Sequence, residues 1–304
     1  SIKRPMGLFS WKGDTIKTIS TIDSLKHYLK FLNTGMLSIE PSTGAVRTYV
    51  GGIDYRYFKY DHISQSERQV GSSFKPFVYT AAIENGLDPC TYFSLDKVTY
   101  TDYDNWTPTN SGSKEEDPYI NYTLEKALSN SINTISVKVM ENVGIPKVLE
   151  QVEKLGISKK LPNEPSLALG VAEISLKDLT GAFASYLNDS KAVTPYYITK
   201  IEDKSGNVIA TFEPEISKKE AYSDYTRQVL LEMMKSTVNH GTASRLRSTY
   251  GLKNDIAGKT GTTQNNKDGW FVGLTPNLVT VTWVGNDNHA IGFKSTGLGQ
   301  GANS

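Results

Sequence analysis

The sequence predicts a mixed α/β fold in which helices flank an antiparallel sheet of about five strands. Strand-like patterns lie near both ends of the chain, at residues 36–52 and 255–287, whereas residues 123–156 and 175–188 have helical patterns. No internal repeat or low-complexity tract interrupts this order. Strands, then helices, then strands favour one sheet assembled from both chain ends, together with a mainly helical subdomain.

Hairpins and a meander account for the predicted sheet. The stretch "MLSIEPSTGAVRTYVGG" alternates in polarity on both sides of a Pro-Ser-Thr-Gly turn, which is typical of a hairpin. Near the end of the chain, "DIAGKTGTT", "DGWFVGLTP" and "LVTVTWVGND" are strand-like segments with short turns, and such neighbours usually pair in antiparallel order. A further hairpin is predicted in "YYITKIEDKSGNVIATFEP", with its turn at residues 205–207.

The segment "RQVGSSFKPFVYTAAIENG" predicts a helix with one apolar face. Its apolar residues recur at helical spacing: Phe74, Phe77, Val78, Ala81 and Ala82. Pro76 is tolerated in a first turn, and Gly86 is a suitable end. Helices are also predicted within residues 123–156, with a break around "LSNSINT", at residues 175–188, and in "DYTRQVLLEMMKSTVNHG", which closes on Gly241.

The chain divides unevenly. Residues 1–34 are rich in Thr, Ser and Lys and open in the polar, loop-like stretch "SIKRPMGLFSWKGD", so they predict a linker or a small accessory layer. Residues 35–304 then form the main domain, with a helical insertion at about residues 87–190. A chain of 304 residues is long enough for one large domain.

Composition excludes several classes of function. Lys and Arg number 33 against 32 Asp and Glu, and this net charge of +1 gives no electrostatic reason to expect a nucleic-acid partner. The single cysteine, Cys90, excludes an internal disulfide framework, and the four histidines show no metal-ligand spacing, so neither a metal nor a cofactor is expected. No apolar run approaches the ~18 residues of a membrane span, and no signal peptide opens the chain.

A serine nucleophile is the first candidate for chemistry. Ser72 and Lys75 lie at i and i+3 and therefore share one helix face, whereas Ser73 and Lys75 point apart. Spacing thus favours Ser72 as nucleophile and Lys75 as its base, provided that burial or a second cation lowers the pKa of the lysine. Taken alone, a helix cap is the commoner role for such a serine.

The same Ser-x-x-Lys spacing occurs twice more, at Ser94/Lys97 and at Ser111/Lys114. Both pairs lie in polar, turn-rich sequence without an apolar helix behind them, so we interpret them as solvated loop residues. Spacing by itself is therefore weak evidence, and the interpretation of Ser72 depends on other parts of the chain.

Two further elements supply such evidence. Ser131-Ile132-Asn133 lies where the helical pattern breaks; its hydroxyl and amide can relay a proton and hold a substrate amide, although alone it reads as a polar turn. In Lys259-Thr260-Gly261-Thr262, the lysine and hydroxyls can bind a carboxylate, and Gly261 leaves room for a substrate backbone beside a strand edge. No phosphate-loop pattern surrounds this lysine.

In this order, Ser-x-x-Lys, Ser-x-Asn and Lys-Thr-Gly are the signature of penicillin-binding proteins and serine β-lactamases. The longer stretches "RQVGSSFKP", "PSLALGVAEISLKDLTGAFASYLN", "GTASRL" and "AGKTGTTQNNKDGWFVGLTP" resemble the transpeptidase domain of class A penicillin-binding proteins. The likeness runs from about residue 35 to the end, and the opening resembles the linker before that domain. It implies a fold like that of penicillin-binding proteins and serine β-lactamases.

The resemblance also implies catalytic roles. Ser72 attacks the carbonyl of a terminal D-Ala-D-Ala peptide and forms an acyl-enzyme, with Lys75 as base. Ser131 relays a proton to the leaving D-Ala, and Asn133 holds the substrate amide. Lys259 keeps the local field positive, which helps the other lysine to stay neutral.

Substrate contacts follow from the same likeness. Thr260 and Thr262 would bind the terminal carboxylate beside Gly261, and the backbone N–H groups of Ser72 and Thr262 would form the oxyanion hole. Trp106 and Trp270 are candidates for the cleft edge, although aromatic residues near strands more often belong to a core.

Partners and location are implied as well. The expected partners are peptidoglycan stem peptides ending in D-Ala-D-Ala and β-lactam antibiotics. The expected parent is a bacterial, extracytoplasmic protein with a membrane anchor and an upstream glycosyltransferase domain, of which this chain is a soluble fragment. Two departures from the family stand out: Asn188 is followed by Asp189-Ser190-Lys191 instead of Gly-Gly, and the chain stops at "GLGQGANS".

Other functions remain open. A D,D-carboxypeptidase uses the same residues with water as acceptor. A β-lactamase needs a base for deacylation, and Glu164 in "NEPSLAL" superficially resembles one; its surroundings fit the transpeptidase pattern and lack the Asn that orients a water, so we interpret Glu164 as a surface loop residue. A non-catalytic penicillin sensor or scaffold is less compatible with an intact set of motif residues.

Overall fold

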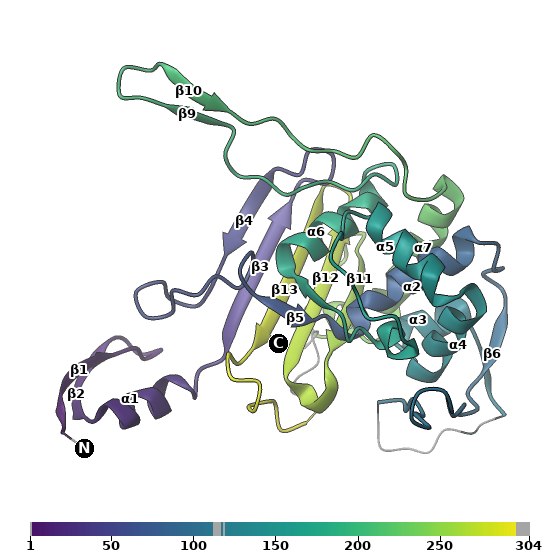
Figure 1. The fold of residues 1–304 in the computed structure, drawn as a ribbon, viewed down its shortest axis with the longest axis horizontal. Coiled ribbons are helices and arrows are strands. Elements are labelled where there is room, and N and C mark those ends of the chain that lie inside the picture. Colours follow the sequence, from purple (N-terminus) through teal and green to yellow (C-terminus); the bar gives the residue numbers. More distant parts are fainter. Residues whose placement is uncertain (1, 112–116, 118, 296–304) are drawn as a thin grey trace.

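The computed structural model describes residues 2–111, 117 and 119–295. A five-stranded antiparallel sheet with the order β11-β12-β13-β3-β4 forms its centre (Figure 1). The strands are β3 (Asn33–Ile39), β4 (Val46–Val50), β11 (Ala257–Thr262), β12 (Asp268–Thr275) and β13 (Leu278–Gly285). Because β13 pairs with β3, the two ends of the chain meet in one sheet, which confirms the predicted architecture.

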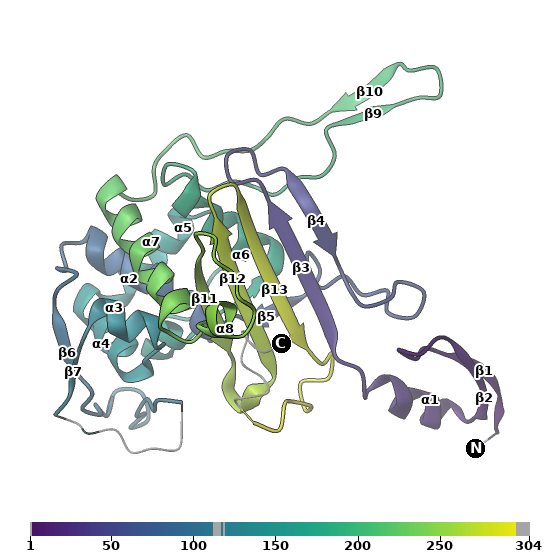
Figure 2. The same cartoon turned by 180° about the vertical axis from the view of Figure 1, so that it is seen from behind.

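Helices cover both faces of this sheet and form a bundle at one side. They are α2 (Lys75–Glu84), α3 (Leu124–Ser129), α4 (Asn133–Val143), α5 (Ile145–Lys154), α6 (Leu176–Ala184), α7 (Asp224–Asn239) and α8 (Arg245–Ser248), with the 3₁₀ turns η1 (Gly71–Phe74), η2 (Pro165–Leu169), η3 (Ser185–Leu187) and η4 (Gln264–Asn266). Helix α6 packs on β3 and β13, and α7 packs on β11. In the opposite view, α8 lies over the sheet (Figure 2).

Helix α2 differs from the prediction of one apolar face. Every residue from Lys75 to Ile83 is buried, because α4, α5, α7 and η2 surround the helix. Its boundaries agree with the sequence: Pro76 lies in the first turn, and Gly86, at φ +96°, follows the end. The consequence is that Lys75 is fully buried rather than on a helix face toward solvent.

The opening of the chain, predicted to be loop-like within a linker or small accessory layer, contains regular structure instead. Residues 4–8 form β1 (Arg4–Leu8), which pairs with β2 (Thr15–Ile19), and α1 (Thr21–Tyr28) follows. Leu8 and Phe9 are buried, and the ring of Phe9 packs edge-on against Phe31 and Phe58. These contacts come from distant residues, so the local polarity gave no sign of them. The layer stands apart from the main sheet (Figures 1 and 2).

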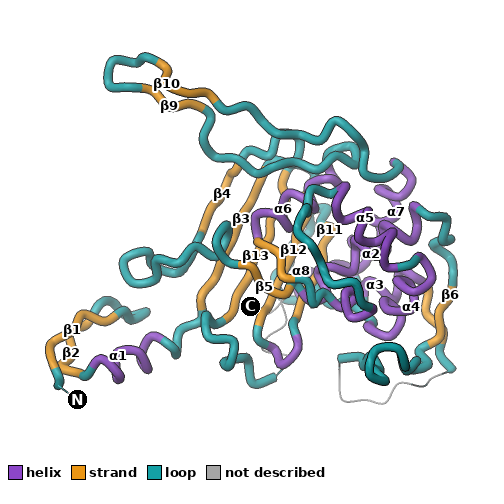
Figure 3. Tube along the Cα trace, in the orientation of Figure 1, coloured by secondary structure: helices purple, strands orange, loops and turns teal. Residues whose placement is uncertain are grey.

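The third predicted hairpin is also present. Strands β9 (Lys200–Glu202) and β10 (Val208–Thr211) pair around a turn in which the Asp203 carboxylate accepts the backbone N–H groups of Ser205 and Asn207. This hairpin projects from the body of the domain (Figure 3). The Ser-Gly-Asn triplet is therefore a turn, as predicted.

Two short ladders escaped sequence reasoning. Strands β5 (Glu67–Gln69) and β8 (Glu173–Ser175) pair with each other, and so do β6 (Tyr92–Ser94) and β7 (Asn121–Thr123). Each strand has only three residues, which is too short for a polarity pattern to emerge. The β5 strand matters for function because it leads directly into η1 and Ser72.

The described part of the chain has neither a membrane-spanning helix nor an evident metal site. None of its helices combines the length and the apolar character that a bilayer crossing requires. Within those same ranges, no three His, Cys, Asp or Glu side chains gather as a metal-binding group.

Candidate active site

The three predicted motifs meet at one cleft of about 720 Å³. Ser72 comes from η1, Ser131 from the turn between α3 and α4, Asn133 from the start of α4, and Thr260 and Thr262 from β11, and all five line the cleft. Beneath them lie two lysines, Lys75 and Lys259, each with no exposed surface. The structure therefore brings together all the segments that the sequence singled out.

The two adjacent serines differ sharply. Ser72 is half-buried and lines the cleft, and its hydroxyl takes part in none of the hydrogen bonds among the described residues. Ser73 is fully buried, and its hydroxyl donates to the Val70 carbonyl at 2.6 Å. Ser73 thus closes the η1 turn, whereas Ser72 presents a free hydroxyl to the cleft.

Lys75 is bound to the second motif. Its Nζ donates to the Ser131 carbonyl at 2.6 Å, to Ser131 Oγ at 3.2 Å and to Asn133 Oδ1 at 2.7 Å. Burial lowers the pKa of Lys75 well below its ordinary value, and the charge of Lys259 lowers it further. Ser131 has φ +59°, a left-handed conformation that is uncommon outside glycine. Sequence spacing had linked Lys75 only to Ser72, so this set of partners is new.

Lys259 approaches the same serine from the sheet. Its Nζ donates to Ser131 Oγ at 3.0 Å and to the Thr260 carbonyl at 3.0 Å. Burial lowers the pKa of Lys259 to about 7. The hydroxyl of Ser131 consequently lies between two buried amines, an arrangement suited to passing a proton.

We expect the folded domain to gain stability with rising pH through Lys259. Its pKa is about 7 in the folded domain against an ordinary 10.5, so between these values the unfolded chain binds more protons and the free energy of unfolding rises with pH. Below about pH 7 both states are protonated and the dependence ends. In Lys259→Met, the slope of unfolding free energy between pH 7 and 9 should fall by roughly 1 kcal/mol per pH unit. Denaturant titrations of both proteins measure it, and equal slopes would contradict a buried amine with a lowered pKa.

Asn133 is held by a loop that sequence reasoning missed. Its Nδ2 donates to the Thr109 carbonyl at 2.8 Å, and its backbone N–H donates to Asn110 Oδ1 at 2.8 Å. Asn110 Oδ1 also accepts the backbone N–H of Thr134 at 3.0 Å, so Asn110 caps the start of α4 from outside the helix. Ordinary capping signals lie next to their helix, which explains why this one was not found. The role of Asn133 toward a substrate amide stays a prediction.

The structure gives a reason for glycine at position 261 that the sequence did not reveal. A Cβ at this position would lie 2.7 Å from the Val70 carbonyl oxygen and 2.9 Å from Trp270 Cβ. Gly71, at φ +53°, likewise meets the Thr262 carbonyl oxygen at 2.7 Å from its ideal Cβ position. The two glycines allow η1 and β11 to pack closely, and Gly261 is not among the cleft-lining residues. Its proposed effect on substrate access stays a prediction.

A third hydroxyl accompanies the two predicted threonines. Thr242, in the segment "GTASRL" after α7, also lines the cleft, and its Oγ1 lies 2.6 Å from Thr260 Oγ1. Its backbone N–H donates to the Ser129 carbonyl at 3.1 Å, which ties this segment to α3. Together with Thr262, these residues form a hydroxyl-rich wall with Lys259 behind it, and such a wall can bind an anion.

Of the two other Ser-x-x-Lys pairs, Ser94/Lys97 is not assembled for chemistry. Lys138 Nζ donates to the Ser94 carbonyl at 2.9 Å and to Ser94 Oγ at 3.2 Å, whereas Lys97 is exposed. Ser111 is exposed as predicted, although it also lines the cleft, and Lys114 lies outside the described residues.

The remaining predictions divide between cleft and core. Trp106 is half-buried and lines the cleft, whereas Trp270 is 1% exposed and donates its Nε1–H to the Gln69 carbonyl at 2.9 Å. Glu164 is exposed and accepts the Ser166 hydroxyl, as expected for a surface loop residue, and it does not line the cleft.

The turn after η3 has Asp189 and Ser190 where the family has Gly-Gly, and both adopt a backbone conformation that is unfavourable for residues with a side chain. Asp189 and Ser190 have φ of +46° and +61°, the left-handed region that glycine adopts most easily. A Gly-Gly pair at these positions would fit the same turn. The final stretch from residue 296 lies outside the described residues.

Fold and site define a member of a known class. The family profile described as "Penicillin binding protein transpeptidase domain" matches residues 34–297. The chain belongs to the family of penicillin-binding protein transpeptidase domains.

Within this family, the chain is similar to penicillin-binding proteins 1A. It is 36% identical to that of Aquifex aeolicus over 259 residues, which are 84% of this chain and 34% of the relative. The corresponding protein of Neisseria lactamica is 34% identical over 265 residues, 84% of this chain and 32% of the relative. The chain thus spans about a third of the length of the curated relatives that it matches.

Solved structures agree with the predicted fold. Penicillin-binding protein 1A from Haemophilus influenzae superposes with a TM-score of 0.77 at 27% identity, covering 86% of this chain and 44% of that one. The PonA1 protein from Mycobacterium tuberculosis in complex with penicillin V superposes with a TM-score of 0.72 at 25% identity, covering 88% and 72%. The fold expected from the sequence motifs is confirmed.

Proposed function

We propose that this domain is a serine D,D-transpeptidase that cross-links peptidoglycan. The observation that carries the proposal is the Ser131 hydroxyl between two buried lysines, in the same cleft as the unengaged hydroxyl of Ser72. Among the described residues that line this cleft, none is a histidine, an aspartate or a glutamate. The lysines beneath the cleft are therefore the bases that the chemistry would use.

Acylation begins with proton removal from Ser72. A neutral Lys75, favoured by its lowered pKa, takes this proton while Ser72 Oγ attacks the carbonyl carbon of the penultimate D-Ala. The developing oxyanion accepts hydrogen bonds from the backbone N–H groups of Ser72 and Thr262. The C–N bond then breaks, and Ser131 passes a proton to the leaving D-Ala amine while it takes the Ser72 proton from Lys75, which becomes neutral again.

Deacylation reverses these roles. An amine of a neighbouring stem peptide loses a proton through the Ser131 path and attacks the ester carbon. The new amide is released, and Ser72 recovers its proton from Lys75. Until the D-Ala leaves in acylation, its terminal carboxylate lies against the hydroxyls of Thr260 and Thr262, where Lys259 supplies positive charge.

A β-lactam would enter the same pathway. A structural relative has been solved in complex with penicillin V. By the geometry of the cleft, the β-lactam carbonyl would take the place of the peptide carbonyl and leave Ser72 acylated. We extend the proposal to the whole protein from which the domain comes: a bacterial cell-wall enzyme at the outer side of the cytoplasmic membrane, with an anchor and a glycosyltransferase domain.

Product analysis distinguishes the proposed transpeptidase from a carboxypeptidase, a β-lactamase and a non-catalytic sensor or scaffold. The domain is incubated with a synthetic peptide ending in D-Ala-D-Ala and an amine acceptor, and the products are separated by mass. A cross-linked amide with release of D-Ala is the expected result. A shortened acid alone would point to a carboxypeptidase, and rapid hydrolysis of penicillin to a β-lactamase. Failure to release any D-Ala, with or without a penicillin adduct, would leave a sensor or scaffold.

A further inference from the structure

Two buried charged residues lie near the candidate site without lining it. Arg68 is 5% exposed and Asp268 is 3% exposed, and the guanidinium NH1 lies 3.4 Å from Asp268 Oδ1. Arg68 lies in β5, just before the η1 turn that carries Ser72, and Asp268 begins β12, just after the turn that follows Thr262. The pair therefore joins the two segments that hold the proposed oxyanion hole.

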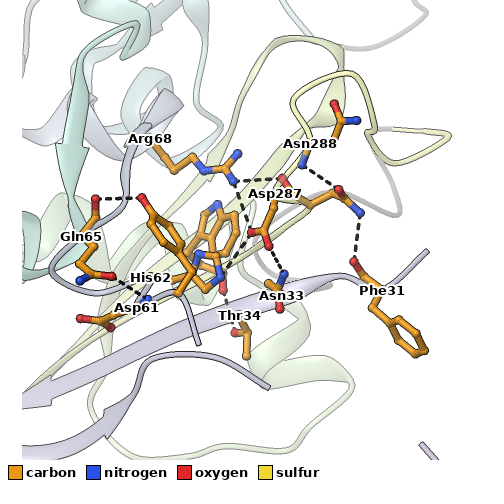
Figure 4. Close-up of polar contacts among 12 residues, drawn as sticks. Phe31, Asn33, Thr34, Asp61, His62, Gln65, Arg68, Asp287 and Asn288 are labelled. Atoms are coloured by element: carbon orange, nitrogen blue, oxygen red, sulfur yellow. Dashed lines mark hydrogen bonds and ion pairs between the residues drawn. The ribbon is translucent and has the colours of Figure 1, made fainter. Parts of the chain in front are cut away.

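Arg68 has a well-defined environment. Its NH2 donates to the Asn286 carbonyl at 3.0 Å, and the guanidinium lies 4.8 Å from the ring centroid of Trp283. Figure 4 shows Arg68 and His62 directed toward Asp287, whose carboxylate lies 3.9 Å from Arg68 NH2 and 3.4 Å from His62 Nε2. With contacts on several sides, the guanidinium has little freedom to move.

Asp268 holds the segment that follows Thr262. Its Oδ2 accepts the Thr263 hydroxyl at 2.9 Å, and its backbone N–H donates to Thr263 Oγ1 at 3.0 Å. Its Oδ1 accepts Trp283 Nε1–H at 2.9 Å as well as Arg68. One carboxylate thus holds the residue after Thr262 and the strand before Ser72 at the same time.

The backbone that follows Arg68 packs tightly against β11 and β12. Trp270 Nε1 donates to the Gln69 carbonyl at 2.9 Å, directly after Arg68. The Val70 carbonyl and Gly71 then lie so close to β11 that a Cβ at Gly261 or Gly71 would overlap the opposite backbone. A shift of Arg68 or Asp268 is therefore passed to the Ser72 and Thr262 amides rather than absorbed.

We propose that the Arg68–Asp268 ion pair is a positioning element for acylation, which sets the separation of the Ser72 and Thr262 backbone N–H groups. The inference rests on the proposed function. A buried ion pair is a poor source of net stability, but its geometry is directional. Loss of one oxyanion donor lowers a rate by about 10²–10³-fold, so a partial displacement should have a smaller but measurable effect.

The test separates binding from chemistry in penicillin acylation. For Arg68→Met and Asp268→Asn, we expect the acylation rate constant to fall about 10–100-fold. The dissociation constant of the non-covalent complex should change less than about 3-fold, since neither residue lines the cleft. The acylation rate constant of the double variant should be no lower than that of the slower single variant, because both changes break one pair. Rapid-quench mass spectrometry gives both constants.

Two variants guard against a trivial result. Glu67→Gln, on the same strand, breaks an exposed ion pair with Lys159 and should leave both constants unchanged. Arg68→Lys keeps the charge, and we expect it to recover part of the acylation rate, which a merely misfolded protein would not do. If Arg68→Met does not fold, Arg68→Lys takes its place in the test.

Each outcome decides a different question. Folded Arg68 or Asp268 variants with the wild-type acylation rate would overturn the positioning role, and so would multiplicative losses in the double variant. Losses confined to thermal stability would make the pair structural only. A wild type that penicillin does not acylate would instead overturn the proposed function, and the positioning role with it.

Discussion

Ser72→Ala should abolish covalent labelling by penicillin, whereas Ser73→Ala should still be labelled. Removing the attacking oxygen leaves no bond to form, so the mass shift of the adduct should vanish. Ser73 instead donates to the Val70 carbonyl inside the η1 turn, and its loss should lower stability by about 1 kcal/mol without removing the reaction.

Intact-protein mass spectrometry followed by peptide mapping measures this pair of variants. The two serines are adjacent, so each variant serves as the matched control of the other. An adduct that persists in Ser72→Ala, or that disappears only in Ser73→Ala, would transfer the nucleophile to Ser73 and contradict the proposed mechanism.

Lys75→Ala should slow acylation at least ~100-fold, the usual contribution of a general base. Lys75 is the buried amine whose pKa is lowered most clearly by both burial and a second lysine. Since protonation removes its lone pair, we also expect the wild-type acylation rate to fall as the pH is lowered through the pKa of Lys75, and the residual rate of the variant to lack this step.

Lys138→Ala is the matched control for that experiment. Lys138 also donates to a serine, at 3.2 Å from Ser94 Oγ, and burial lowers its pKa, but it lies outside the cleft. The acylation rate, followed by stopped flow with a fluorescent penicillin, should be unchanged in this control. A Lys75→Ala protein that acylates like Lys138→Ala would mean that another group accepts the Ser72 proton.

The sheet was predictable because its information is local. The alternation along β3 and β4 and the three segments of β11, β12 and β13 each carry a strand pattern, and short turns favour antiparallel neighbours. The hairpin at β1 and β2 was missed for the opposite reason: Phe9, which follows β1, is buried against residues farther along the chain, among them Phe31 and Phe58.

The sequence by itself determined the family and the order of the motifs, and it predicted Ser72 rather than Ser73 as the nucleophile, because helical spacing and motif order are properties of the chain. Only the tertiary structure decided which groups contact Lys75. Its amine meets Ser131 and Asn133 across a tertiary contact, and its pKa depends on burial, which no local pattern measures. The Arg68–Asp268 pair belongs to the same category, since it joins residues 200 positions apart that meet only in the folded domain.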